Sequence, residues 1–516
     1  AIGLISTAAL LGRILSIPCG IVTAKYLGPS LFGILSVLNI IRQYIGYTHF
    51  GLLQSLPRDV PIAYGRGDKK EAELRKNTIF TGFFAISTIG ILGLWVLFLF
   101  GFTFNSTLNL SRLILISLIF IAGRIHSFLV AYVKGEGKFI VIGRLDMIYK
   151  IIFPVLTIPA AILFKLTGVL FTTFLAEAIA VGYAVMSLTN LKFHLYFEIK
   201  KTFILLKTGF LIFINKISDN LLLSIGVILL TSMTSAKFVG LYTMALGIVM
   251  AKKVPFAQAV GMTVYRKIMI ESGKYGTENK YHFRKYAEKY SALFLLFNCL
   301  YLGCMILFYM IIIRIFLEEY RESLPLMLIL FFGYVIYISR VFPSYYLNVT
   351  NQLHKRLFAI FTGACLNAIL SYISILKGYG ITGVSVACSL SFIIVSVTII
   401  SISFKQIYND AKPFLYYLLK LFLISTVLTA ILVFFYNWNF FDYNFIQNTF
   451  NKILIGTIDL IIKGLIFSIL CFSIFLALFA KYRLINEIKP ILFYAGNSIM
   501  KIFKIKRKSH YAIEKK

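Results

Sequence analysis

Apolar stretches of near membrane-spanning length follow one another along almost the whole chain. A transmembrane helix needs about 20 mostly apolar residues to cross roughly 30 Å of hydrocarbon. The longest polar stretches cover 57–77, 263–289 and the residues after 481, and each fits a loop or a surface helix. The pattern predicts an all-α polytopic membrane protein with about 14 transmembrane helices. The predicted spans are 3–24, 31–55, 78–100, 112–133, 144–164, 168–190, 205–232, 238–262, 290–313, 324–347, 357–376, 381–404, 413–435 and 455–480.

Composition and charge agree with this class. The chain is 59% hydrophobic and only 14% charged, whereas soluble domains average about a quarter charged residues. Its 52 Lys and Arg give a formal charge of +32, and most of them lie in every second gap between the spans. Because basic loops stay on the cytoplasmic side, this pattern predicts a multi-pass protein of the cell (plasma or inner) membrane with both termini in the cytoplasm. The positive excess is expected to contact anionic headgroups of membrane lipid, so we expect no nucleic-acid partner.

Enzyme and metal signatures are missing from the sequence. The six cysteines lie in apolar runs without CxxC spacing, and the six histidines are scattered and are interpreted as incidental. Neither set predicts a disulfide framework or a metal site. Without a Walker loop, an HExxH motif or a G-x-S-x-G elbow, we expect neither an enzyme nor a cofactor. The chain starts inside an apolar segment without an initiator Met, so upstream residues are expected, and the first span has no cleavage-site character.

Short matches at nearly one offset indicate an internal repeat. Thr-Gly-Val at 167–169 recurs at 382–384, and Phe-Gly-Ile at 32–34 corresponds to Val-Gly-Leu at 239–241. Matching topology in the two halves predicts a parallel repeat about an axis along the membrane normal, which is typical of transporters with a site between two bundles. We expect two pseudo-symmetric six-helix bundles, two appended transmembrane helices and a basic cytoplasmic tail, at 1–195, 200–405, 411–481 and 482–516.

Three runs near the start of the chain carry a family resemblance. LGRIL at 11–15, KYLGPSLFG at 25–33 and GRGD at 65–68 resemble the polysaccharide-export (Wzx-type) flippases of the multidrug/oligosaccharidyl-lipid/polysaccharide exporter superfamily. With the predicted spans and the duplication, the resemblance covers nearly the whole chain. It implies a flippase that moves a polyprenyl-diphosphate-linked oligosaccharide, such as an O-antigen, capsule or exopolysaccharide repeat unit, from the cytoplasmic to the outer leaflet. The lipid-linked glycan is the implied partner, with a glycan polymerase or glycosyltransferases of the same pathway as further candidates.

Basic residues inside the spans are the main candidates for a substrate site. A charge in hydrocarbon costs several kcal/mol unless it faces protein or a water-filled cavity. In the two bundles the basic residues outnumber the acidic ones, which favours an anionic ligand. The residues expected to contact the diphosphate and glycan are Arg124, Arg340, Arg42, Arg13, Lys150 and Lys216.

Arg124 and Arg340 are the most informative pair among these residues. They occupy equivalent positions in spans four and ten, one in each predicted bundle. Two guanidinium groups that face each other across a cavity suit a diphosphate, because Arg binds phosphate oxygens bidentately and keeps its charge. The alternative is that both are anchors that reach toward the membrane interface.

Polar stripes place other candidates on single helical faces. In span two the polar positions recur every three to four residues, at Ser36, Asn39, Arg42 or Gln43, Gly46 and His49. In span seven, the spacing of Lys216 and Asp219 allows a local ion pair. Such stripes also arise where helices hydrogen-bond to one another, and this alternative stays open.

Acidic residues in the spans are candidates for ion coupling. Glu177 is alone in span six and, together with Asp219, is the best candidate for a titrating or ion-binding carboxylate. A single carboxylate that is hydrogen-bonded across a helix interface is the competing interpretation of Glu177. Asp459 and Lys463 lie four residues apart in the last span, which predicts a local ion pair.

Three other functions compete with the flippase. A cation-coupled multidrug exporter of the same superfamily would need acidic residues around its cavity, and the first predicted bundle is mostly basic. A membrane glycan polymerase or ligase would carry a sizeable external loop, and the external gaps here are short and poor in acid/base groups. A non-transporting scaffold would not explain why Arg124 and Arg340 occupy equivalent positions in the spans.

Overall fold

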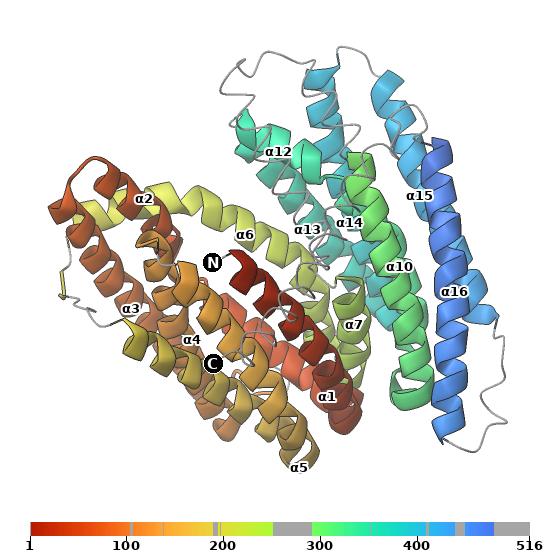
Figure 1. Ribbon diagram of the computed structural model, residues 1–516, viewed down its shortest axis with the longest axis horizontal. Coiled ribbons are helices and arrows are strands. Elements are labelled where there is room, and N and C mark those ends of the chain that lie inside the picture. Colours follow the sequence, from red (N-terminus) through yellow and green to blue (C-terminus); the bar gives the residue numbers. More distant parts are fainter. Residues whose placement is uncertain are drawn as a thin grey trace, which may run out of the picture. The chain divides into compact units, whose positions relative to one another are not determined.

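A computed structural model describes residues 2–103, 107–137, 139–188, 194–196, 198–250, 291–350, 352–408, 412–438 and 449–478. Throughout these residues the regular structure is helical (Figure 1), as the apolar pattern predicts. The loop at 263–289, the end of predicted span eight and the basic tail at 482–516 lie outside the described residues. The prediction of an all-α membrane protein is therefore confirmed for the part of the chain that the structure describes.

The chain forms two compact units, which are described separately. The first comprises residues 1–250, 309–333 and 353–395, and the second comprises 251–308, 334–352 and 396–516. The helices are α1 (Ile2–Ile45), α2 (Leu52–Gly65), α3 (Lys69–Leu99), α4 (Leu110–Gly135), α5 (Phe139–Ser187), α6 (Ile199–Met233), α7 (Ala236–Val249), α10 (Ser291–Phe316), η2 (Glu318–Tyr320), α11 (Ser323–Ile338), α12 (Val341–Val349), α13 (Leu353–Leu376), α14 (Gly380–Ile407), α15 (Lys412–Asn437) and α16 (Thr449–Leu478). The predicted division into two six-helix bundles and two appended helices stays a prediction.

Eleven helices in the described residues are long and apolar enough to cross a membrane. Two of the helical runs contain a break between two predicted spans. In α1 the break is at Gly28, with φ 65°, followed by Pro29, and in α5 it is at Lys165, with φ 48°. The apolar part of α5 has 45 residues, roughly twice the length that one crossing needs. The predicted count of 14 spans stays a prediction.

A further helix break, after α1, differs from the sequence prediction. Span two was expected to run without interruption over 31–55, but α1 ends at Ile45 and α2 begins at Leu52. Between them, Phe50 and Gly51 adopt positive φ angles of 45° and 92°. Glycine tolerates this conformation and a phenylalanine rarely adopts it. Predicted span ten is likewise divided, because α11 ends at Ile338 and α12 begins at Val341.

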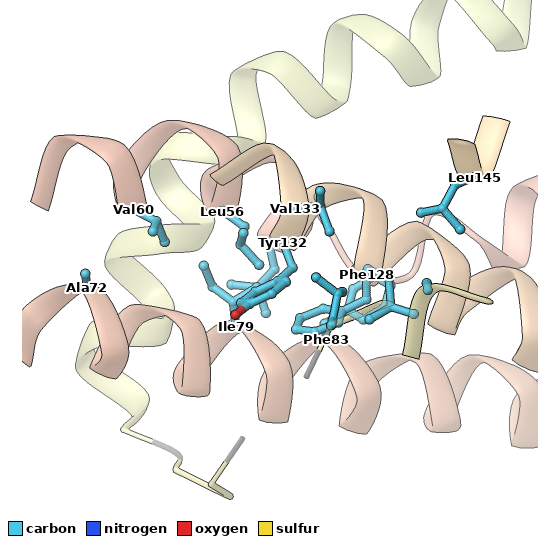
Figure 2. Close-up of a cluster of buried hydrophobic side chains, with 14 of the residues drawn as sticks. Leu56, Val60, Ala72, Ile79, Phe83, Phe128, Tyr132, Val133 and Leu145 are labelled. Carbon is cyan, nitrogen blue, oxygen red and sulfur yellow. The ribbon is translucent and has the colours of Figure 1, made fainter. Parts of the chain in front are cut away.

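An apolar core holds α2, α3, α4 and α5 together in the first unit. Figure 2 shows its side chains, among which Phe83 of α3 and Phe128 of α4 lie close together. Their ring centroids are 6.2 Å apart, and both side chains are almost completely buried. Burying an aromatic side chain of this size contributes about 1.5–3 kcal/mol. The core therefore fixes the stretch of α4 that precedes Phe128.

Two glycines allow α1 and α7 to approach closely. A Cβ added to Gly33 would overlap the carbonyl oxygen of Ala236, and one added to Gly240 would overlap that of Pro29. Between the same helices, the Ser36 hydroxyl donates to Thr243 Oγ1 at 3.0 Å. Gly33 and Gly240 are the central residues of one of the sequence matches that indicated the repeat. Two positions that the predicted repeat relates to each other therefore meet in this contact.

The turn before α11 is tied to α1 in the same unit. Tyr320 in η2 is almost completely buried, and its hydroxyl donates to the Ala24 carbonyl at 3.1 Å. Its ring meets Phe32 edge-on, with centroids 6.0 Å apart. Burial and, to a smaller extent, the neighbouring Glu319 raise the pKa of Tyr320. The hydroxyl therefore stays protonated and remains a donor over the physiological range of pH.

In the second unit, α10 and α16 pack closely. The space beside Gly303 of α10 is filled by the ring of Phe467 from α16. The predicted pair on α16 is confirmed, since Lys463 Nζ lies 2.9 Å from Asp459 Oδ2 with both side chains buried. Lys420 of α15 donates to the Leu478 carbonyl at 2.6 Å. The in-span charges of α15 and α16 thus have protein partners.

We expect Gly33→Ala to lower the free energy of unfolding by about 1–3 kcal/mol, because the added methyl group overpacks the contact with α7. Gly20→Ala is the matched control, since nothing lies within 4 Å of a Cβ at this position of the same helix. The control should be neutral or stabilising by up to about 1 kcal/mol. Thermal unfolding in detergent measures both variants. If Gly33→Ala unfolds at the temperature of the native chain, the close α1–α7 contact is wrong.

Candidate functional site

A polar cavity of about 500 Å³ lies inside the first unit. Residues from α1, from the turn after it and from α2, α4, α5 and α6 line it, and we refer to it as the cation cavity. Its polar lining residues are Asn39, Arg42, Gln43, Tyr47, His49, Gln54, Arg124, Ser127, Glu177, Lys216 and Asn220. The stripe predicted for span two contributes Asn39, Arg42, Gln43, Gly46 and His49 to this wall. Ser36, the first residue of the stripe, instead contacts Thr243.

Arg124 is held by the break that follows α1. Its Nη1 donates to the Gly46 carbonyl oxygen at 2.9 Å. The guanidinium carbon lies 5.1 Å from the ring centroid of Phe120 and 5.8 Å from that of Phe83. A Cβ at Gly46 would come within 2.9 Å of Arg124 Nη2, so glycine leaves room for the guanidinium group. The buried Nε has no hydrogen-bond partner among the described residues, which leaves a donor for a ligand.

Two further cations share the cavity with Arg124. Arg42 is half-buried on α1 and Lys216 is exposed on α6. In the described part of the chain, none of the three forms a salt bridge with a carboxylate. Glu177 is the one carboxylate among the residues that line the cavity. The lining therefore carries an excess of positive charge, which attracts anions.

Glu177 is paired with a histidine that the sequence analysis treated as incidental. His126 Nδ1 of α4 and Glu177 Oε2 of α5 are in hydrogen-bond contact, and both side chains are largely buried. The His126 ring also lies 6.0 Å from that of Tyr149. The interpretation of His126 as incidental is wrong, because it provides the contact across the helix interface that was the competing account of Glu177. No sequence signal identified this contact, because the two residues are 51 positions apart.

Hydrogen bonds between α1 and α6 close one wall of the cavity. The hydroxyl of Tyr47 accepts hydrogen bonds from Gln43 Nε2, at 2.7 Å, and from Asn220 Nδ2. The Tyr44 hydroxyl lies 2.6 Å from Ser224 Oγ. Neither tyrosine was a predicted site residue, because Tyr is common at membrane interfaces and carries no charge.

Two predicted site residues have partners outside the cation cavity. Lys150 Nζ lies 2.5 Å from Asp146 Oδ2, one turn away on α5. Asp219 Oδ2 lies 2.8 Å from Arg356 Nη2 of α13, in place of the local pair with Lys216 that the spacing suggested. The contact of Asp219 with Arg356 on another helix could not be predicted from the sequence. The predicted roles of Lys150 in binding and Asp219 in coupling stay predictions.

The remaining candidates are not brought into this cavity by the described contacts. Arg340 belongs to the second unit, where it is buried at the start of α12 with its guanidinium carbon 3.9 Å from the ring centroid of Tyr337. Arg13 is on α1, and its side chain lies outside the described residues. The predicted pairing of Arg124 with Arg340 stays a prediction. Across the described residues, no three His, Cys, Asp or Glu side chains are grouped to hold a metal ion.

Comparison with solved structures defines the class of fold. The lipid II flippase MurJ in an inward closed conformation superposes with a TM-score of 0.64 at 19% identity, covering 90% of this chain and 98% of MurJ. An inward-facing multidrug resistance MATE family transporter of the MOP superfamily gives 0.61 at 13% identity, covering 77% and 95%. A MOP superfamily transporter from Pyrococcus furiosus, described as having a binding pocket of reverse polarity, gives 0.50 at 13% identity, covering 79% and 95%. The chain has the MOP-type transporter fold.

A family model narrows this class. The polysaccharide biosynthesis protein family matches residues 1–265, which is more than half of the chain. The chain belongs to this family, and the resemblance seen in its first 70 or so residues is confirmed. No curated protein sequence matches it.

The Asp219–Arg356 contact predicts an energetic coupling between α6 and α13. We expect a double-mutant cycle with Asp219→Asn and Arg356→Gln to give a coupling free energy of about 1–2 kcal/mol, because both side chains are largely shielded from solvent. The Glu318–Arg321 pair is the control, since its side chains are 73% and 54% exposed. It should couple by about 0.5 kcal/mol or less. Thermal unfolding provides the free energies. A coupling free energy of zero would show that the Asp219–Arg356 contact does not contribute to stability.

Proposed function

We propose that this chain is a flippase that moves a polyprenyl-diphosphate-linked oligosaccharide from the cytoplasmic to the outer leaflet. The observation that carries the proposal is the cation cavity, in which Arg42, Arg124 and Lys216 face one space and form no salt bridge with a carboxylate of the described residues. Membership of the polysaccharide biosynthesis protein family and the fold shared with the lipid II flippase MurJ support a lipid-linked glycan as the substrate.

The chemistry of the cavity suits a diphosphate. A guanidinium group offers a planar set of donors that matches phosphate oxygens, and it stays charged in an apolar bundle. The Gly46 carbonyl and the two aromatic rings fix Arg124, so it loses little conformational freedom when an anion binds. Arg42 and Lys216 add charge from neighbouring helices. Such a preorganised cluster replaces the water that the diphosphate loses when it leaves the aqueous phase.

We further propose that Arg340 contributes from the second half of the chain, as its equivalence with Arg124 suggests, and that Arg13 lies near the same path. Alternating access would then expose the site first to the cytoplasm and later to the outside. A drug exporter that selects cations is a poorer fit, because the one carboxylate of the cavity lining is already in contact with His126. We place the protein in the inner or plasma membrane with both termini in the cytoplasm.

Transbilayer movement of a fluorescent polyprenyl-diphosphate oligosaccharide in proteoliposomes tests the proposal. We expect the native chain to move this lipid and the Arg124→Gln/Arg340→Gln variant to be slower by at least about 100-fold. Each lost charge-assisted hydrogen bond contributes roughly 1.5–3 kcal/mol, which gives this magnitude. Arg42→Gln/Lys216→Gln tests the cavity of the first unit separately.

Arg112→Gln is the matched control, because Arg112 is on the same helix as Arg124 but donates to the Thr107 carbonyl at 2.8 Å, outside the cation cavity. It should move the lipid at the native rate. Normal movement by both double variants would contradict the anion site. No movement by the native chain, with several glycans and imposed gradients, would return the drug exporter as the leading hypothesis.

Glu177→Gln tests ion coupling. Replacing the carboxylate keeps the shape of the side chain but removes the charge that His126 contacts. If the pair binds the coupling ion, the variant should lose the dependence of transport on an imposed proton or sodium gradient while retaining movement down the substrate gradient. Transport is measured in the same vesicles with and without each gradient. An unchanged dependence would assign Glu177 a structural role.

A further inference from the structure

The opposite face of α1 lines a second hollow in the same unit. This hollow, which we call the apolar groove, has a volume of about 1110 Å³ and runs between α1, α3 and α6. Val37, Ile41 and Ile45 form its wall on α1, and Gly93 and Val96 form part of its wall on α3. The second half of α1 therefore has two faces of opposite polarity, one toward each hollow.

Two threonine hydroxyl groups on the wall of the apolar groove already donate to backbone carbonyls a few residues away in the chain. Thr48 Oγ1 donates to the Ile45 carbonyl at 2.8 Å, and Thr231 Oγ1 donates to the Val227 carbonyl at 2.7 Å. The other lining side chains are mostly aliphatic. A polar ligand would lose its hydrogen bonds with water here, so the groove suits hydrocarbon. Its volume of about 1110 Å³ is slightly above the range of about 300–1,000 Å³ that small-molecule pockets occupy.

The apolar groove is open along α3 and has unfilled space at its floor. Nothing lies within 4 Å of a Cβ added to Gly93. Ile89, Val96 and Phe102 are 68%, 48% and 60% exposed, respectively. A flexible chain can therefore enter from the side without displacing packed residues.

Two tyrosines separate the apolar groove from the cation cavity. Tyr44 lines the groove and Tyr47 lines the cavity. Their rings meet edge-on, with centroids 5.6 Å apart. Each hydroxyl is tied to α6, Tyr44 at Ser224 and Tyr47 at Asn220. A residue of the groove lining thus contacts a residue of the cavity lining, and we call this pair the tyrosine partition.

We propose that the apolar groove binds the isoprenoid tail of the lipid-linked substrate whose diphosphate lies in the cation cavity. An amphiphile with an anionic head and a long hydrocarbon tail fills both spaces at once, and the tyrosine partition is where the head joins the tail. This inference rests on the proposed function. It assigns the groove to the substrate, and ordinary bilayer phospholipid is the competing occupant.

Photocrosslinking in proteoliposomes of phosphatidylethanolamine and phosphatidylglycerol tests the assignment. A benzophenone-bearing amino acid replaces Val96 in the groove or, as the matched control, Leu92 on the same helix. Leu92 is 57% exposed but does not line the groove. With a radiolabelled polyprenyl diphosphate as the probe, we expect labelling at Val96 to exceed that at Leu92 by about tenfold or more, which corresponds to roughly 1.4 kcal/mol of preference. Excess unlabelled polyprenyl diphosphate should abolish the labelling at Val96.

Gly93→Phe provides a second measurement, because it fills the groove where space is available. We expect it to slow movement of the long-chain lipid by about tenfold or more and to leave binding of inorganic diphosphate unchanged. Gly20→Phe, at another open position on α1, should affect neither.

Phospholipid adducts alone at Val96, in a chain that still moves the probe, would overturn the groove assignment while the proposed function stands. Native transport by Gly93→Phe would do the same. If the native chain neither binds inorganic diphosphate nor moves the probe, the proposed function fails, and the groove assignment fails with it.

Discussion

The candidate site depends on one hydrogen bond, which Arg124 donates to the carbonyl oxygen of Gly46 in the break after α1. A guanidinium group inside an apolar bundle needs an oxygen partner, because desolvation of the charge is otherwise too costly. In an unbroken helix the Gly46 carbonyl would bond to an amide one turn later. Here it accepts from Arg124, and the absence of a side chain at Gly46 lets the guanidinium approach. The core around Phe83 and Phe128 then holds α4 at the required depth.

The sequence predicted those features of the site that depend on the periodicity of a single helix. The periodicity of span two placed Asn39, Arg42 and Gly46 on one face, and the structure has them around one cavity. The spacing of Asp459 and Lys463 predicted their pair for the same reason. Contacts between helices were not predictable, since Glu177–His126 and Asp219–Arg356 join residues far apart in the chain. The break after Ile45 was also missed, because Gly46 and His49 were assigned to a polar stripe on one continuous helix.

Charge separates the two faces of α1 more sharply than its composition suggests. The helical run α1 is apolar on average, so the positions of its few polar residues decide which face is polar. One face supplies Arg42 to a cavity with two other cations, and the other supplies Val37 and Ile41 to an aliphatic wall. The tyrosine partition joins both faces to α6. The helix α1 therefore separates a charged cavity from an aliphatic groove within one compact unit. Rotation of α1 would exchange the side chains that face these two spaces.

The bond from Tyr320 to the Ala24 carbonyl has a consequence for biosynthesis. The two residues are 296 positions apart, and a ribosome that adds about 5–20 residues each second needs roughly 15–60 s to make the intervening chain. During this interval the first helices are already in the bilayer. The Ala24 carbonyl, close to the helix break at Gly28, does not yet have Tyr320 as its hydrogen-bond donor. This end of the first unit can thus be enclosed only after the chain has been made as far as Tyr320. A ribosome that stalls before η2 would leave an inserted but open half in the membrane, which is a substrate for quality-control proteases.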